Sequence, residues 1–211
     1  PLSFTCIRGG WTLIPINEAA AAYSSNNKLN NIALNPIWFL GNNVLKSGFS
    51  KGNPFEKLSD AKAIQITEDL LKNPVALSPD SVLANPKCNV VIILLESWTA
   101  DVIEPLGGVK DVTPFFSSLA KDGLLFSQTY SSGFRTDQGL TSVLSGFPSI
   151  PDKSIIKFID KTQQLPSLGR IFADAGYQNR FYYGGELGFA NMNNFLLQSG
   201  FEERTDINEF D

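Results

Sequence analysis

Histidine is absent from the 211 residues of this sequence. Histidine is the commonest metal ligand in proteins and a frequent general base. If the chain belongs to a metal enzyme, part of the ligand set is therefore missing from it.

Long apolar segments are also absent. The longest uninterrupted run is Val90–Leu95, which is far shorter than the roughly 20 residues that a membrane-spanning helix needs. We therefore expect that the chain does not cross a membrane by itself. It begins at Pro1 without a signal peptide, so we interpret it as an excised piece of a longer protein.

Excess positive charge and a cysteine framework are lacking as well. The formal net charge is -4, which argues against a general nucleic-acid binder because such proteins usually carry a basic stripe. Two cysteines, Cys6 and Cys88, are too few for a disulfide scaffold. They either pair in an oxidising compartment or pack as thiols, and the sequence leaves both possibilities open.

The first part of the chain, residues 1–85, has the pattern of a helical lead-in. Residues 18–23 are rich in alanine, while residues 33–45 and 59–72 carry apolar side chains at helical spacing. Three prolines then interrupt the pattern between residues 74 and 86. We expect no chemistry from this part.

The second part, residues 86–211, alternates predicted strands and helices. Residues 89–95 form a continuous β-branched and leucine run, which is typical of a strand buried on both faces. Further strands are predicted at 124–130 and 178–183, and helices at 113–122, 139–144, 167–175 and 188–198. This alternation predicts an α/β fold, a mostly parallel sheet with helices on both faces.

Glu96 directly follows the predicted strand 89–95. Ligand sites of open α/β sheets gather at the carboxyl ends of the strands, so a glutamate there is placed to bind a divalent cation. The alternative is a glutamate at a helix start that is satisfied by backbone N–H groups. Position alone does not decide between the two.

Thr136 lies in a loop of small polar residues, 131–139, that leads from a predicted strand into a helix. A hydroxyl at a helix N-terminus faces free N–H groups that favour an anion such as phosphate. Thr136 would then be a nucleophile activated by a metal, and Arg135 would hold an anionic group. The alternative is that Thr136 caps the helix, the commoner role of threonine at such a position.

Residues 182–192 form a third candidate segment, with two glycines after a predicted strand. Gly184 and Gly185 permit a tight turn or the close approach of a ligand, and Phe189 and Asn191 are placed to line a pocket. The alternative is a connecting loop whose glycines serve geometry alone.

In this order, the segments resemble the lipoteichoic acid synthase group of the sulfatase and alkaline phosphatase superfamily. Residues 89–97 resemble the family's first strand and its glutamate metal ligand, and Thr113–Pro114 resembles the next helix start. Thr136 stands where the family places its nucleophile, 40 positions after Glu96. Residues 183–192 resemble the stretch that contacts the phosphoglycerol head group. The ordered series is far more specific than any one motif.

The resemblance implies an alkaline-phosphatase-like fold, here truncated. It also implies a site that is completed by residues absent from this chain. Glu96 and Thr136 would bind a divalent metal, Mn²⁺ or Zn²⁺, together with an aspartate and histidines that the chain lacks. The implied substrate-binding residues are Arg135, Tyr183, Gly185, Phe189 and Asn191. The chain alone would be inactive.

The implied function is that of a metal-dependent transferase or hydrolase acting on phosphate or sulfate esters. Thr136 would attack phosphorus and form a phospho-threonine intermediate that passes to an alcohol or to water. The substrate would be a phospholipid-derived head group such as phosphoglycerol, with no nucleic acid as partner. Membrane helices preceding the chain would hold the catalytic domain outside the cytoplasm, at the cell membrane.

Three positions depart from the family pattern. Tyr183 stands where the lipoteichoic acid enzymes carry a histidine, and Ala190 and Met192 stand where they carry tryptophan and arginine. A head group other than that of polyglycerol-phosphate synthesis is therefore plausible. Thr136 also lacks the formylglycine signature of true sulfatases, which argues against an arylsulfatase mechanism. The alternative function is a non-catalytic relative that binds a glycan, a lipid head group or a partner.

Overall fold

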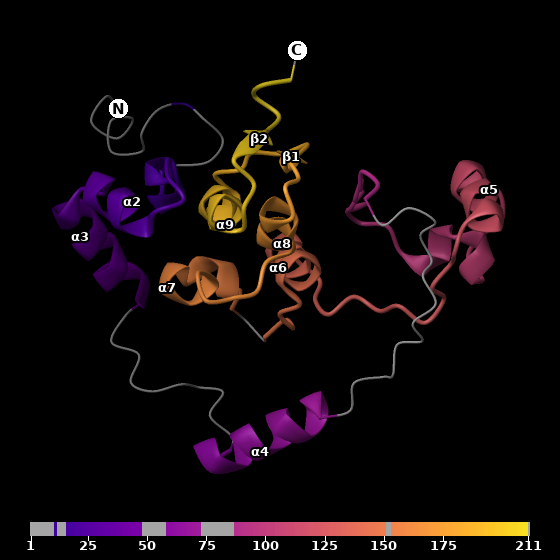
Figure 1. The fold of residues 1–211 in the computed structure, drawn as a ribbon, viewed down its shortest axis with the longest axis horizontal. Coiled ribbons are helices and arrows are strands. Elements are labelled where there is room, and N and C mark those ends of the chain that lie inside the picture. The colour runs from indigo at the N-terminus through magenta and orange to yellow at the C-terminus, as the bar shows by residue number, and fades with distance from the viewer. Residues whose placement is uncertain (1–10, 12–15, 48–57, 73–86, 151–152, 211) are drawn as a thin grey trace. The chain divides into compact units, whose positions relative to one another are not determined.

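The computed structural model describes residues 11, 16–47, 58–72, 87–150 and 153–210 (Figure 1). The chain divides into two compact units, one of Pro1–Asn42 with Glu96–Asp211 and the other of Asn43–Leu95. The domain division at residues 85 and 86 stays a prediction. Pairing of Cys6 with Cys88 also stays open, because Cys6 lies outside the described residues.

Short helices make up the described lead-in, as the sequence predicts. They are η1 (Glu18–Ala21), α2 (Asn27–Ala33), α3 (Pro36–Ser47) and α4 (Asp60–Leu71). Asparagine side chains start two of them: Asn26 accepts the N–H of Lys28, and Asn35 accepts that of Ile37, each at 3.0 Å. The spacing of apolar residues does not predict α2.

The helices predicted after residue 110 are all present, with small shifts at their ends. The elements that follow the lead-in are η2 (Ala100–Val102), η3 (Glu104–Leu106), α5 (Pro114–Asp122), α6 (Thr136–Ser145), η4 (Ile155–Lys157), α7 (Ile159–Thr162), α8 (Leu168–Asp174), η5 (Phe189–Asn191) and α9 (Met192–Gln198). Gly146 ends α6 in the left-handed region, at φ 62°, and donates its N–H to Ser142 O. No described helix is both long enough and apolar enough to span a membrane.

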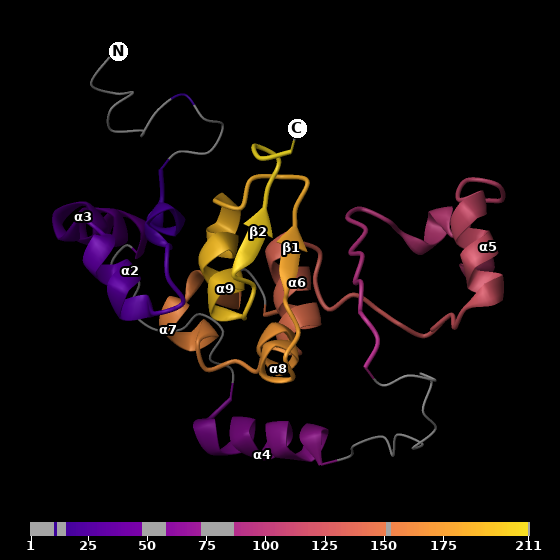
Figure 2. The same cartoon turned by 45° about the horizontal axis from the view of Figure 1, so that its top comes forward.

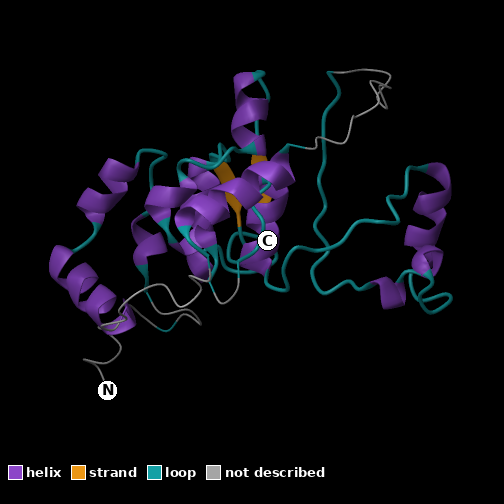
Figure 3. Cartoon of the chain, turned by 90° about the horizontal axis from the view of Figure 1, so that it is seen from below, coloured by secondary structure: helices purple, strands orange, loops and turns teal. Residues whose placement is uncertain are grey.

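Two parallel strands, β1 (Arg180–Tyr182) and β2 (Glu203–Thr205), form the sheet of the described residues. Phe181 lies opposite Arg204 in the register. The chain between the strands contains α9, so the three elements form a βαβ unit (Figure 2). Helices surround this strand pair (Figure 3). The α/β class is therefore present in a small sheet.

The strands predicted at 89–95 and 124–130 are wrong for this structure, which has no regular secondary structure in either segment. Val91 and Phe126 are 83% and 75% exposed. A strand needs neighbouring strands to pair its N–H and C=O groups, and a strand of this apolar composition also needs cover on both faces. The described residues supply neither, so the apolar pattern alone does not produce a strand.

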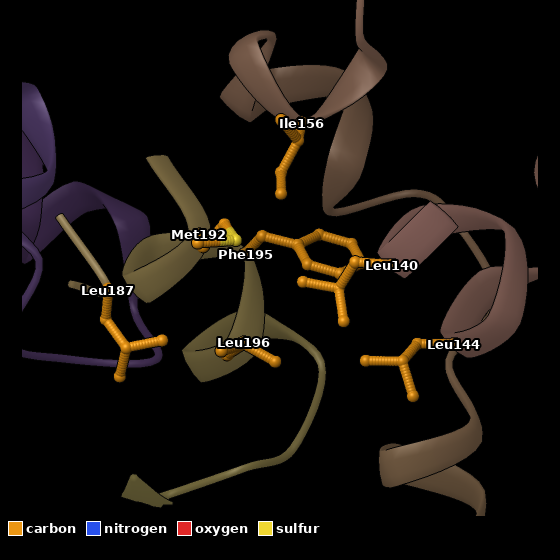
Figure 4. Packing of buried hydrophobic residues seen from close by; sticks show 7 residues of the cluster. All are labelled: Leu140, Leu144, Ile156, Leu187, Met192, Phe195 and Leu196. Atoms are coloured by element: carbon orange, nitrogen blue, oxygen red, sulfur yellow. The ribbon is translucent and has the colours of Figure 1, made fainter. Parts of the chain in front are cut away.

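The hydrophobic core lies between α6, η4 and α9. Leu140 and Leu144 of α6, one turn apart, meet Phe195 and Leu196 of α9, and Ile156 closes the cluster from η4. Figure 4 shows the Phe195 ring pointing toward Leu140. Because α6 and η4 join this core, and η5 packs against η4 and α9, the core fixes the elements that carry the candidate site.

The core position of Phe195 gives a stability prediction. Phe195 is 1% exposed, so Phe195→Ala should lower the free energy of unfolding by about 3–5 kcal/mol through lost burial and a residual cavity. Urea denaturation followed by circular dichroism measures the change. Phe115→Ala, at a 76% exposed site, is the matched control and should change it by less than about 0.5 kcal/mol. Equal effects of the two substitutions would contradict this assignment of the core.

Candidate functional site

The side chains of Glu96 and Thr136, the two residues on which the predicted site rests, are in contact. Thr136 is the first residue of α6, and its Oγ1 donates a short hydrogen bond to Glu96 Oε1. The N-cap position belongs to Arg135, which has extended backbone, so the Thr136 hydroxyl is not the cap of this helix. Residues 40 positions apart are thus brought together at a helix N-terminus.

A pocket of about 410 Å³ opens beside this pair. It is lined by Phe134, Arg135, Thr136, Asp137, Lys157, Phe189 and Ala190. Three of the predicted site residues, Arg135, Thr136 and Phe189, are among them. The sequence did not indicate Phe134, Asp137 and Lys157 as site residues. The first two stand within the motif already noted, whereas nothing in the sequence connects Lys157 to it.

Two cations contribute to the pocket lining, Arg135 and Lys157. The Arg135 guanidinium lies over the Phe134 ring at 5.3 Å from the centroid, within the range of a cation–π contact. The free N–H groups at the start of α6 add positive potential on the same side. The pocket is therefore suited to an anion that carries an apolar portion.

Asn191 lies outside the pocket lining, although the sequence predicts it there. It is absent from the pocket lining, and its amide Nδ2 donates to Ile156 O at 3.0 Å. Asn191 and the preceding Ala190 both have left-handed backbone, with φ of 66° and 49°. Asn191 thus ties η5, which carries Phe189, to η4, which carries Lys157.

Tyr183 and Gly185 follow β1 and do not line the pocket. Tyr183 donates its backbone N–H to Thr205 O at 2.9 Å, which extends the pairing of β1 with β2. A Cβ on Gly185 would lie 2.8 Å from a carbon of the Tyr183 ring, so glycine leaves room for that ring. Burial, and secondly the negative charge of Glu96, raise the pKa of Tyr183. Tyr183 therefore remains a neutral hydroxyl close enough to Glu96 to sense its charge.

The oxygen donors of this site fit part of a cation shell. Glu96 and Thr136 present a carboxylate and a hydroxyl to the same point, and such oxygens suit divalent cations. The neighbouring Asp137 is 3% exposed, and its Oδ1 has no hydrogen-bond partner among the described residues. Within the same residues no group of three His, Cys, Asp or Glu side chains is arranged to hold a metal. A cation shell built on these oxygens alone would be incomplete.

Residues 88–210 match the protein-family model described as Sulfatase. Phosphoglycerol transferase I of Citrobacter koseri and the protein of that name from Salmonella arizonae are each 30% identical to this chain over 132 residues. Each alignment covers 59% of the chain and 17% of the relative, so the match spans about a sixth of those proteins.

A solved structure gives the fold. The crystal structure of a protein in the alkaline phosphatase superfamily from Vibrio parahaemolyticus superposes with a TM-score of 0.51 at 30% identity. The superposition covers 55% of this chain and 28% of the chain from Vibrio parahaemolyticus. The predicted fold class and the predicted family resemblance are both confirmed by these matches.

The electrostatic link between Tyr183 and Glu96 can be tested by titration. Glu96→Gln removes a negative charge that raises the pKa of Tyr183, so this pKa should fall toward the ordinary tyrosine value and stay above it because burial remains. NMR titration with ¹³Cζ-labelled tyrosine measures the shift, and Tyr183→Phe assigns the resonance. Glu209→Gln is the matched control. An unchanged Tyr183 titration in Glu96→Gln would contradict the link.

Proposed function

This chain belongs to the sulfatase family, and we propose that it carries the nucleophile of an enzyme that transfers or hydrolyses phosphate esters. Thr136 is the nucleophile in this proposal, and Glu96 is its partner. The hydrogen bond between their side chains is the observation that carries the proposal. A threonine that only starts a helix has no need of a carboxylate 40 positions away.

The Thr136–Glu96 pair suits nucleophilic attack because acceptor and donor are already aligned. Thr136 Oγ1 attacks phosphorus, the new O–P bond forms, and the P–O bond to the leaving alcohol breaks. The hydroxyl proton passes to Glu96 Oε1, which accepts it in the hydrogen bond, and then to the oxygen of the leaving alcohol. In the second step an acceptor alcohol or water attacks the phosphorus and the O–P bond to Thr136 breaks. The proton of the acceptor passes through Glu96 to Thr136 Oγ1, which restores the hydroxyl.

A divalent cation, Mn²⁺ or Zn²⁺, completes the proposal. Glu96 is exposed and bonds to the Thr136 hydroxyl, so these two side chains would contribute oxygen ligands to the cation. When bound, the cation would lower the pKa of that hydroxyl and make it a stronger nucleophile. Further ligands would come from outside the described residues.

The substrate of this proposal is an anionic ester with an apolar portion. Arg135 and Lys157 supply the countercharges, and the N-terminus of α6 supplies N–H groups. Phe134 and Phe189 are 86% and 50% exposed, and their rings offer apolar contact at the pocket. A phospholipid-derived head group such as phosphoglycerol, as in the name of the similar transferases, has this chemistry.

The setting follows from the same substrate. A phospholipid donor lies in a membrane, so the proposed enzyme works at the membrane surface. The proposal includes a catalytic domain outside the cytoplasm. Residues 1–85 would then connect the catalytic domain to membrane helices. Tyr183, Gly185 and Asn191 remain proposed contributors, through the shape of the site rather than through the pocket lining.

The nucleophile is tested in the protein that carries this sequence. Thr136→Ala should lower turnover of a phosphatidylglycerol donor more than about a thousandfold, because the attacking oxygen is gone. Mass spectrometry of quenched reactions should find a glycerophosphoryl group on Thr136 in the parent protein and none in this variant. Both a rate and a covalent state are then measured.

Two variants control for the Thr136 substitution. Thr136→Ser keeps a hydroxyl and should retain measurable turnover, whereas Thr129→Ala changes an exposed threonine elsewhere and should have no effect. Full turnover in Thr136→Ala would exclude the nucleophile. Binding of the lipid by the parent protein without any turnover would favour the non-catalytic alternative.

Lys157 gives a separate prediction about substrate binding. Lys157→Ala should raise KM about three- to tenfold with little change in kcat, because an exposed countercharge contributes to binding rather than to bond making. Added salt should shrink the difference through screening. Steady-state kinetics at two ionic strengths measure both effects. Lys153→Ala, an exposed lysine that does not line the pocket, is the matched control; the same KM change in both would contradict a local role for Lys157.

A further inference from the structure

We propose that residues 17–22 of the lead-in act as a brace that sets the pocket wall formed by Phe189 and Ala190. The brace is defined here as Asn17–Ala22, which includes η1. It contributes no residue to the pocket lining. Its role is to position the wall, so the affinity of the pocket for any ligand depends on a segment that belongs to the lead-in.

Two amide side chains join the brace to the segment that contains the wall. Asn17 Nδ2 donates to Gly188 O at 3.0 Å, and Asn193 Nδ2 donates to Ala22 O at 3.2 Å. The partners in each bond are 171 positions apart, so the bonds are tertiary contacts. They attach to Gly188 and Asn193, which lie on either side of Phe189 and Ala190. The wall is thereby held at both ends.

Apolar burial supports the same contact. Ala19 and Ala22 are 2% and 8% exposed, although the brace is short and η1 is a single turn. The η1 turn packs against η5 and α9, the elements that contain and follow the wall. The small alanine side chains allow the backbone of the brace to approach closely, which the two hydrogen bonds require.

The wall needs such support because its backbone is strained. Ala190 and Asn191 both have positive φ, at 49° and 66°, a region that residues with a side chain rarely adopt. Strained residues persist where the surrounding structure holds them, and they cluster at ligand sites. Asn191 is held from the side of η4 by its bond to Ile156 O, and the brace holds the opposite flanks. Release of the brace should therefore let the wall relax and change the pocket.

The side-chain oxygens of Asn17 and Asn193 also accept hydrogen bonds, so a substitution can remove the donor of each side chain and keep its acceptor. Asn17 Oδ1 accepts the N–H of Ala19 at 2.9 Å, and Asn193 Oδ1 accepts from Arg204 Nε at 2.8 Å. Aspartate keeps both acceptor roles and lacks the N–H donors. Asn17→Asp and Asn193→Asp therefore remove the two donated bonds and keep the η1 cap and the contact to β2.

The test combines hydrogen exchange with ligand affinity, on the single variants and on Asn17→Asp/Asn193→Asp. Amide exchange at Phe189 and Asn193, whose N–H groups donate to Glu186 O and Leu187 O, should speed up about five- to tenfold, with no change in α6. The NMR-measured affinity of this chain for glycerol 1-phosphate should fall several-fold. In the protein that carries the sequence, KM should rise more than kcat falls.

Asn26→Asp is the matched control for each single variant, because it also adds one negative charge and keeps the acceptor that caps α2. It should leave exchange and affinity unchanged. Unchanged exchange at residues 186–193 in the double variant, or a uniform increase across α6 as well, would overturn the brace. The exchange result does not depend on catalysis, so a failure of the proposed function, seen as no glycerol 1-phosphate binding by the parent chain, is distinguishable from a failure of the brace.

Discussion

The packing of α9 against α6 and η4 is the interaction on which the rest of the candidate site depends. Phe195 and Ile156 are 1% and 0% exposed, and burying each such side chain stabilises the fold by about 1.5–3 kcal/mol. Each helix that contributes to this core also carries or adjoins a piece of the pocket. Thr136 begins α6, Lys157 ends η4, and Phe189 lies just before α9. One apolar cluster thus sets the distances between a hydroxyl, a cation and an aromatic ring.

Hydrogen bonds between side chains and backbone then fix the orientation of the segments that the apolar core brings together. The Thr136–Glu96 bond attaches an otherwise irregular segment to the start of α6, and the bond from Asn191 to Ile156 O joins two sides of the pocket. Hydrogen bonds are directional, whereas hydrophobic burial is not, so these bonds fix orientation where the core fixes proximity. The amides of Asn17 and Asn193 extend this arrangement to the lead-in, outside the family match at 88–210.

The sequence by itself determined the helices that follow residue 110 and the family of the chain. The helices at 114–122 and 192–198 follow from periodicity and from their boundary residues, because both signals act within a few residues. The ordered motifs identified the family, and they selected Glu96 and Thr136 as a pair before any geometry was known. Such motifs are informative because the residue type at each position suits one and the same reaction. The order of the motifs along the chain is a property of the sequence alone.

The tertiary structure alone decided which distant segments meet. Residues 89–95 have strand propensity but form no strand here, because strand pairing depends on partners that no local pattern specifies. Lys157 lines the pocket because the neighbouring Ile156 is buried in the core. The sequence around Lys157 does not indicate this position. The amide of Asn191 bonds to the Ile156 carbonyl, a contact that its own sequence segment does not indicate. Side-chain direction follows from packing across the whole unit, so sequence determines which groups are available and tertiary contacts determine where they point.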